Sequence, residues 1–275
     1  MSTPARRSRP TNVLEVVAVE QLAPHLVRIW AGGEGLEAFE GSDATDRYVK
    51  IWFTQPGHDL DAPWDVEELR QTLAPEQLPV SRTYSVPVVE ADRVAIDFVV
   101  HGDEGLAGPW AAAAKPGDRI VFSGPGGGYA PDASADAHLL AGDESAIPAI
   151  GAALAWMAEH APAAVGTAYV EVHGTADELA LPRPAGVDLV WLHRGEAVTA
   201  GTSPVLADAV AGHAFVDGRT HVFAHGEREA MKAIRDVVKR QGIAREDLSL
   251  SGYWAHGRTE DRFQAEKREP IGQIL

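Results

Sequence analysis

The stretch Arg82-Thr83-Tyr84-Ser85 lies between two prolines and suggests how the rest of the chain is organised. If it ends a β-strand, successive side chains point to opposite faces, so Arg82 and Tyr84 share one face and Ser85 lies on the other. An arginine offers a planar fork to a phosphate, a tyrosine ring packs on an aromatic ligand, and a serine hydroxyl is a short donor. The stretch therefore suits a flavin nucleotide, although four residues by themselves are more typical of an ordinary strand end with a surface Arg and a half-buried Tyr.

Composition and charge restrict the function classes open to the chain. Its 275 residues are enough for two domains, and 45% hydrophobic with 23% charged residues is ordinary globular usage. A formal net charge of −16 argues against nucleic acid, because such proteins neutralise phosphates with Lys and Arg. The absence of cysteine excludes a disulfide framework, a Cys-ligated iron–sulfur cluster and a Cys nucleophile. No signal peptide or membrane span is visible, so we expect a cytoplasmic protein without integral membrane association.

The first half of the sequence predicts short β-strands separated by turns. Enrichment in β-branched residues indicates strands over residues 13–19, 26–30, 48–53, 82–89 and 94–100. Residues 55–79 contain several prolines and are expected to form an irregular insertion. Short strands at this spacing favour a small antiparallel β-barrel.

A glycine-rich turn follows the last of these strands and leads into an alanine-rich helix. Its candidate ligand residues are His101, Gly102, Gly105, Leu106, Ala107, Gly108, Pro109 and Trp110. Pro109 suits the first turn of a helix, and the backbone N–H groups and dipole there favour an anion. Glycines before a helix usually mark only a turn, so the prediction of a flavin pyrophosphate site depends on the pairing with Arg82.

The second half predicts a Rossmann-like domain with a parallel sheet. Apolar runs at residues 138–141, 167–173, 187–193, 221–224 and 248–254 alternate with helical patterns at 146–160, 204–211 and 227–241. Strands separated by helices are typical of parallel βαβ units. We therefore expect a β-barrel domain over residues 1–130, a linker near 131–136, and an α/β domain of the nucleotide-binding type with a C-terminal tail over residues 131–275.

Two expected strand ends carry polar residues that could face a nucleotide. Asp143, Glu144 and Ser145 follow the first strand of this domain, and Glu227 follows the fourth. Ligands of parallel sheets bind at the carboxyl ends of strands, but neither segment has the G-x-G-x-x-G pattern. Helix capping by these acidic and hydroxyl side chains is expected whether or not a nicotinamide nucleotide binds.

Several motifs occur together in an order typical of one flavoprotein family. They are residues 82–85, 97–102, 105–111, 142–150, 252–254 and 257–261. With these motifs the chain resembles the siderophore-interacting protein family of FAD-dependent ferric-siderophore reductases, in the ferredoxin-reductase-like superfamily. The resemblance spans most of the chain. It implies an FAD-binding barrel before a Rossmann-like half, and reduction of chelated Fe(III) with electrons from NAD(P)H or, in some members, a ferredoxin.

The resemblance also implies roles for individual residues. Arg82, Thr83, Tyr84 and Ser85 would hold the flavin, the backbone of residues 105–110 its pyrophosphate, and residues 143–145 would face the nicotinamide nucleotide. Many members read Gly-Pro-Ala-Ser-Arg-Trp-Ala in the phosphate loop, whereas this chain supplies neither that Ser nor that Arg. Many also carry Arg after the Tyr-Trp pair, where this chain has Ala255-His256.

An anionic ferric siderophore would need local positive charge on a chain that is acidic overall. The candidate substrate-binding residues are Lys50, His256, Arg258, Lys267 and Arg268. Lys50 fits a solvated strand residue equally well, and the alternating charges of residues 258–269 more often mark an ion-paired exposed helix. His256 stands where the family usually has Arg and could act as a pH-dependent cation.

The expected chemistry belongs to the flavin, so we predict no catalytic acid or base and no resident metal. Two other functions fit the sequence. The first is a flavoprotein that binds ferric siderophore and transfers iron without its own nicotinamide activity. The second is a general NAD(P)H:flavin oxidoreductase acting on small oxidants.

Overall fold

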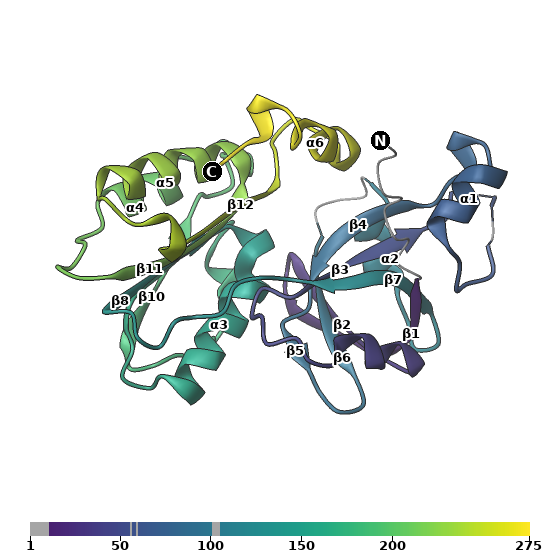
Figure 1. The fold of residues 1–275 in the computed structure, drawn as a ribbon, viewed down its shortest axis with the longest axis horizontal. Coiled ribbons are helices and arrows are strands. Elements are labelled where there is room, and N and C mark those ends of the chain that lie inside the picture. The colour runs from purple at the N-terminus through teal and green to yellow at the C-terminus, as the bar shows by residue number, and fades with distance from the viewer. Residues whose placement is uncertain (1–10, 56, 59, 101–104) are drawn as a thin grey trace, which may run out of the picture. The chain divides into compact units, whose positions relative to one another are not determined.

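The computed structural model describes residues 11–55, 57–58, 60–100 and 105–275. Its contacts divide the chain into two units (Figure 1). The first unit takes residues up to 21, 27–43 and 47–127, and the second takes 22–26, 44–46 and 128–275.

The first unit is built on one seven-stranded antiparallel sheet. Its strands are β1 (Asn12–Ala23), β2 (Leu26–Gly32), β3 (Tyr48–Phe53), β4 (Val80–Ser85), β5 (Val88–Val89), β6 (Val94–Val99) and β7 (Arg119–Gly126). Their order is β4-β3-β7-β1-β2-β6-β5. Within the described residues, no hydrogen-bonded pairing joins the two edges of this sheet into a closed barrel. The sheet is nevertheless curled: β4 and β6 are far apart in the strand order, yet the ring centroids of Tyr84 on β4 and Phe98 on β6 are 4.2 Å apart.

The core of the first unit lies on the inner face of this sheet. On β3, Val49 and Ile51 are buried while Lys50 between them is exposed, which is the alternation expected of a strand with one face in the core. Phe98 and Phe122 are fully buried in the same core. Each such side chain contributes roughly 1.5–3 kcal/mol by leaving water.

Two short helices complete the first unit, and one of them corrects the sequence analysis. Helix α1 (Val66–Thr72) lies inside the expected irregular insertion and begins at Asp65, whose carboxylate accepts a 2.8 Å hydrogen bond from Glu67 N. None of its residues is buried, so it left no apolar periodicity in the sequence. Helix α2 (Ala107–Ala113) follows the glycine-rich turn as expected.

The second unit has the predicted parallel sheet with helices on both faces. Its strands are β8 (Ala137–Gly142), β9 (Val165–Val172), β10 (Gly186–His193), β11 (Thr220–Glu227) and β12 (Leu248–Trp254), in the order β10-β9-β8-β11-β12. Helices α4 (Val205–Ala211) and α5 (Arg228–Arg240) pack on one face through a shared core. Helix α3 (Ile147–His160) covers the opposite face (Figure 1), where a Cβ on Gly142 would meet Ile150.

The chain ends in a tail after β12 that contains helix α6 (Glu260–Glu266). Phe263 of this helix is buried, so the tail contributes to the core of the second unit. None of the helices in the described part of the chain is both long and apolar enough to cross a membrane.

Candidate functional site

The stretch 82–85 ends strand β4 and has the predicted alternation. Arg82 lies opposite Ile51 and Tyr84 opposite Val49, so both side chains project from the face that carries the core. Tyr84 is half-buried against Phe98, and the guanidinium of Arg82 donates to Ser81 O at 2.9 Å. The prediction that Arg82 and Tyr84 share one face is therefore confirmed.

The other face of the same strands carries Ser85 and the substrate candidate Lys50. Ser85 lies opposite Tyr48, and Thr83 lies opposite Lys50, so the four side chains form two adjacent pairs on one face. Ser85 is buried, whereas Lys50 and Thr83 are exposed. Lys50 thus lies next to the predicted flavin-edge donor in the sheet.

The glycine-rich turn is described from Gly105 onward; His101 and Gly102 lie outside the described residues. Gly105 has φ +83°, a conformation that favours glycine, and a Cβ on Gly105 or Gly108 would meet no atom within 4 Å. Leu106 precedes α2, Ala107 is its buried first residue, and Pro109 lies in its first turn. Backbone is consequently accessible at the start of this helix.

The side chain of Trp110 belongs to the core of the first unit. Its ring lies 5.7 Å from that of Phe98 and 5.9 Å from that of Phe53. Because Tyr84 contacts Phe98 as well, β4 and α2 are brought together around one aromatic side chain. Only the backbone of Trp110 fits the pyrophosphate role that the sequence suggested.

In the second unit Asp143 joins three strand ends instead of presenting an open carboxylate. One oxygen accepts the backbone N–H of Ser145 at 2.9 Å and its hydroxyl, which is the predicted cap. The other accepts Glu227 N at 2.7 Å and the indole N–H of Trp254 at 2.9 Å. With both oxygens occupied, Asp143 has a structural role, and a nucleotide would have to displace protein donors to reach it.

Glu144 belongs to a buried charge cluster that the sequence did not reveal. Its carboxylate forms an ion pair with Arg194, which follows β10, and Glu171 of β9 lies 3.8 Å from the same guanidinium. All three side chains are buried. Burial raises the pKa of Glu144, and burial together with the charge of Asp143 raises the pKa of Glu171 to about 7. In the sequence, the only hint of this cluster was an acidic residue, Glu171, inside an otherwise apolar predicted strand.

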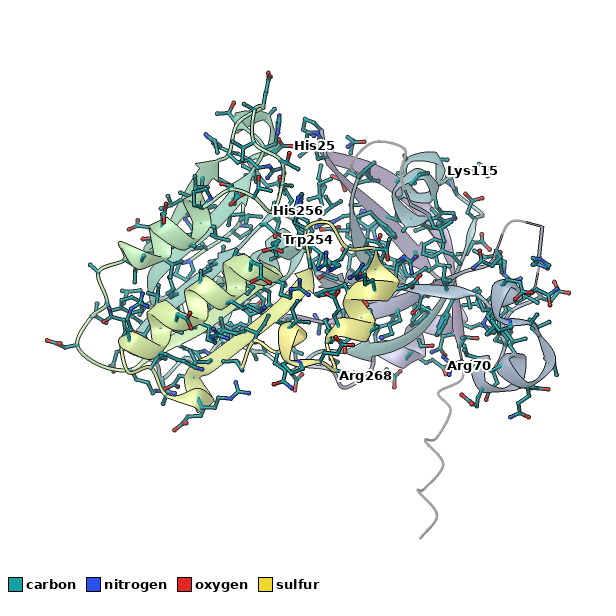
Figure 2. All side chains as sticks on the ribbon, turned by 90° about the horizontal axis from the view of Figure 1, so that it is seen from above. His25, Arg70, Lys115, Trp254, His256 and Arg268 are labelled. Atoms are coloured by element: carbon teal, nitrogen blue, oxygen red, sulfur yellow. The ribbon has the colours of Figure 1, made fainter. Side chains whose placement is uncertain are left out.

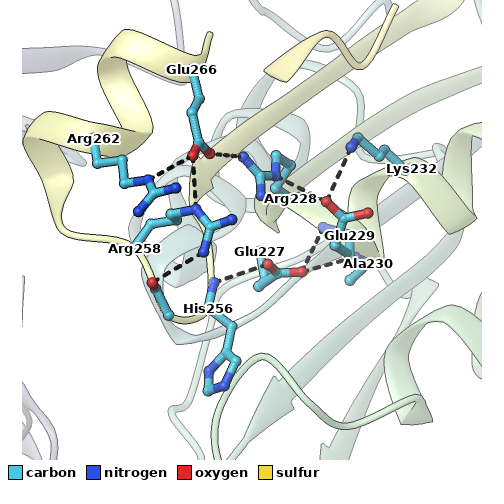
Figure 3. Close-up of polar contacts among 10 residues, drawn as sticks. Glu227, Arg228, Glu229, Ala230, Lys232, His256, Arg258, Arg262 and Glu266 are labelled. Carbon is cyan, nitrogen blue, oxygen red and sulfur yellow. Dashed lines mark hydrogen bonds and ion pairs between the residues drawn. The ribbon is translucent and has the colours of Figure 1, made fainter. Parts of the chain in front are cut away.

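The four substrate candidates beyond β12 follow Trp254 in the chain, and Figure 2 labels two of them, His256 and Arg268. His256 is exposed, its backbone N–H donates to Glu227 at 3.1 Å, and its imidazole points away from that carboxylate (Figure 3). Lys267 lies over the ring of Phe263 at 4.7 Å, and Arg268 is exposed. Arg258 donates to Glu266 at 2.8 Å, so this candidate is held within the protein.

Glu266 is the centre of the tail's ion pairs (Figure 3). Its carboxylate accepts hydrogen bonds from Arg228 at 2.6 Å, Arg258 at 2.8 Å and Arg262 at 3.0 Å. The hydrogen bond from Arg228, followed by those from Arg258 and Arg262, lowers the pKa of Glu266 to about 2. The prediction of an ion-paired tail helix is confirmed, with the difference that its central acid is buried.

Comparison with known proteins identifies the family. Residues 15–129 match the "Siderophore-interacting FAD-binding domain" family and residues 135–257 the "Siderophore-interacting protein" family. Ferric vibriobactin reductase ViuB of Vibrio cholerae is 32% identical over 273 residues, covering 97% of each chain. The chain belongs to the siderophore-interacting protein family.

Two further similarities support membership of the siderophore-interacting protein family. The NADPH-dependent ferric-chelate reductase of Escherichia coli is 34% identical over 191 residues, which are 68% of this chain and 73% of that one. The crystal structure of a siderophore utilization protein from T. fusca superimposes with a TM-score of 0.77 at 36% identity, covering 90% of this chain and 94% of that one. The family resemblance predicted from the motifs and the two-part fold are thereby confirmed.

Proposed function

We propose that this siderophore-interacting protein is an FAD-dependent ferric-siderophore reductase, which reduces chelated Fe(III) to Fe(II) and so releases iron. The match of residues 15–129 to an FAD-binding family and the reductase names of two relatives support this proposal. In the structure it rests on one observation. Tyr84, which shares a strand face with Arg82, and Trp110 of α2, which follows the accessible turn, both pack on Phe98 in the first unit.

The residues of the first unit are chemically suited to FAD. Arg82 would bind a phosphate, Tyr84 would pack on the ribityl chain or ring, and Ser85 would donate to the ring edge. The open space at Gly105 and Gly108 leaves room for the pyrophosphate beside the backbone. When bound, FAD supplies two-electron acceptance from a donor and one-electron transfer to Fe(III).

The protein's own part would be to attract and position the chelate. Lys50 is exposed and lies on the sheet face of Ser85, so it would draw an anionic ferric siderophore towards the flavin edge. Siderophores hold Fe(III) far more tightly than Fe(II), and reduction would therefore loosen the complex. The reaction would take place in the cytoplasm, the compartment expected from the sequence.

One observation favours a second candidate, a flavoprotein that transfers iron without its own nicotinamide activity. The acidic groups at the ends of β8 and β11, Asp143 and Glu227, are fully engaged with protein donors. A reduced ferredoxin could then serve as electron donor in place of NAD(P)H.

Equal rates with simple quinones and ferric chelates would instead indicate a general flavin oxidoreductase.

An anaerobic experiment tests the proposal. The FAD-loaded protein is mixed with NADPH or NADH, the loss of the oxidised flavin absorbance is followed, and a ferric siderophore is added with an Fe(II)-trapping dye. Flavin reduction, reoxidation by the siderophore and dye colour are expected. Flavin that stays oxidised with both nucleotides contradicts direct nicotinamide use. A dithionite-reduced flavin that fails to reduce the siderophore contradicts the reductase itself.

A further inference from the structure

The outer face of strands β3, β4 and β7 carries polar and aromatic side chains that the core does not use. Residues paired across antiparallel strands share a face, and on β3 this face alternates with the buried Val49 and Ile51. We call its polar and aromatic residues the β3 face: Tyr48, Lys50, Trp52, Ser81, Thr83, Ser85 and Ser123. None of these side chains is acidic, although the chain contains 40 Asp and Glu residues.

The two aromatic side chains of the β3 face are held in place by its neighbours. The indole N–H of Trp52 donates to Ser123 Oγ at 2.8 Å, and Ser123 is the cross-strand partner of Lys50. A Cβ on Gly126 would lie 2.6 Å from the hydroxyl oxygen of Tyr48, so the tyrosine ring lies over glycine backbone. Tyr48 and Trp52 are both half-buried, which leaves part of each ring open to a ligand.

Lys50 gives the β3 face its positive charge. It lies between Tyr48 and Trp52 on the same side of the strand, and its side chain is exposed. In the part of the chain that the structure describes, its ammonium group has neither a hydrogen bond nor an ion pair with another residue. Tyr48 and Trp52 are four residues apart, which in a β-strand is roughly 13 Å. A wide anion with flat lobes would therefore contact both rings with Lys50 between them.

We propose that the β3 face selects ferric chelates whose iron-binding groups are aromatic, namely catecholates and phenolates, and that Trp52 is its specificity-determining residue. This inference rests on the proposed function, because it names the substrate class of that reaction. Lys50 attracts the negative charge of such a chelate, while Trp52 and Tyr48 pack on its rings. A chelate without rings gains only the attraction to Lys50.

The position of the β3 face also suits electron transfer from the proposed flavin. Ser85, which the proposed function assigns to the flavin edge, is the cross-strand partner of Tyr48. Directly opposite side chains of antiparallel strands lie about 5 Å apart at Cβ. A chelate that packs on Tyr48 would thus lie beside the residue proposed to mark the flavin edge.

The test separates the rings from the charge with two probes of equal negative charge. These are the gallium(III) complex of a tris-catecholate with a neutral linker and the gallium(III) tris-oxalate complex, each with excess ligand. Gallium(III) replaces Fe(III) because it is not reduced, so binding is measured without electron transfer. Calorimetry with the FAD-loaded full chain compares the wild type, Trp52→Leu and Trp30→Leu. Trp30 is the matched control, because it is a half-buried tryptophan on the outer face of β2 whose indole N–H donates to Glu20 at 3.3 Å.

We expect Trp52→Leu to weaken binding of the catecholate complex about three- to ten-fold, the size of one aromatic contact, and that of the oxalate complex less than about two-fold. Trp30→Leu should leave the affinity for both probes unchanged. Lys50→Met should weaken both probes by a similar factor, because they carry the same charge.

Several results would overturn the inference. These are undetectable binding of the catecholate complex to the wild type, unchanged catecholate binding or equal weakening of both probes in Trp52→Leu, and an effect of the same size in Trp30→Leu. If Trp52→Leu melts early, Tyr48→Leu replaces it and must show the same selective loss. The proposed function is judged separately by chelate reduction with dithionite-reduced flavin, so a reductase without this selectivity would keep its function and lose only the assigned substrate class.

Discussion

Replacing Asp143 by Asn should destabilise the second unit substantially, because this carboxylate links the ends of β8, β11 and β12. Each oxygen accepts two protein donors, and the set includes the buried N–H of Glu227 and the indole N–H of Trp254. A carboxamide keeps one accepting oxygen and turns the other position into a donor. In either orientation, two donors lose their acceptor and face an NH₂ group.

The size of the effect follows from these bonds. If the NH₂ group turns towards Ser145, the hydroxyl can rotate to accept from it and only the backbone N–H of Ser145 is orphaned. If it turns the other way, Glu227 N and the Trp254 indole are both left buried without an acceptor. With about 1.5–3 kcal/mol for each hydrogen bond to a charged group, the loss in unfolding free energy should be about 2–3 kcal/mol.

Equilibrium urea unfolding followed by far-UV circular dichroism measures this loss. Ser145→Ala is the control, because it removes one partly exposed hydroxyl bond to the same carboxylate and leaves no donor without an acceptor, so it should cost only about 1 kcal/mol. Trp254 fluorescence should shift in Asp143→Asn, since its indole then donates to a neutral amide oxygen in place of a carboxylate, or to no acceptor if the amide turns the other way. A loss no greater than that of Ser145→Ala would refute the assignment of Asp143 as a structural link and restore it as a candidate nucleotide contact.

Four further predictions address the flavin, the substrate, pH and the tail. Arg82→Met should raise the FAD dissociation constant about ten-fold or more in fluorescence titrations of the apoprotein, because a charge-assisted phosphate contact is lost; unchanged affinity would contradict the flavin role. Lys50→Met should raise KM for an anionic ferric chelate about three-fold, and the difference should shrink with added salt; a salt-independent KM would exclude the charge role. Burial lowers the pKa of His225 to about 3, so the unfolded chain binds its proton first and stability is lost as pH falls below about 6.5; thermal melting between pH 7.5 and 5 should show a slope that His225→Gln reduces. Glu266→Gln should speed tryptic cleavage in the tail, because its ion pairs with Arg228 and Arg258 are weakened; an unchanged cleavage rate would show that the ion pairs do not fasten it.

The elements that the sequence predicted best are those with a clear burial pattern. Strand β3 was expected at its observed bounds from its β-branched residues, and in the structure Val49 and Ile51 are buried while Lys50 between them is exposed. The α/β order of the second unit followed from apolar runs between helical periods. Helix α1 was missed because none of its residues is buried.

The candidate site was predictable where neighbouring residues in the sequence carry it, and less so where distant ones meet. The faces of Arg82 and Tyr84 follow from strand alternation alone. The meeting of β4 and α2 around Phe98 depends on how the sheet curls, and no local pattern encodes that. The cluster of Glu144, Glu171 and Arg194 joins residues that come from three separate strand ends, so only the parallel order of the strands brings them together.

The charge distribution then narrows the choice among the predicted substrate cations. A chain with net charge −16 repels an anionic chelate at long range, and screening confines this repulsion to about 8 Å at physiological salt. Capture must therefore be local. Arg258 is held in an ion pair with Glu266, whereas Lys50 is exposed beside Thr83 and on the same sheet face as Ser85. A cation next to the predicted flavin residues can act within this screening distance, so Lys50 is the candidate on which electrostatic selection of the substrate should depend.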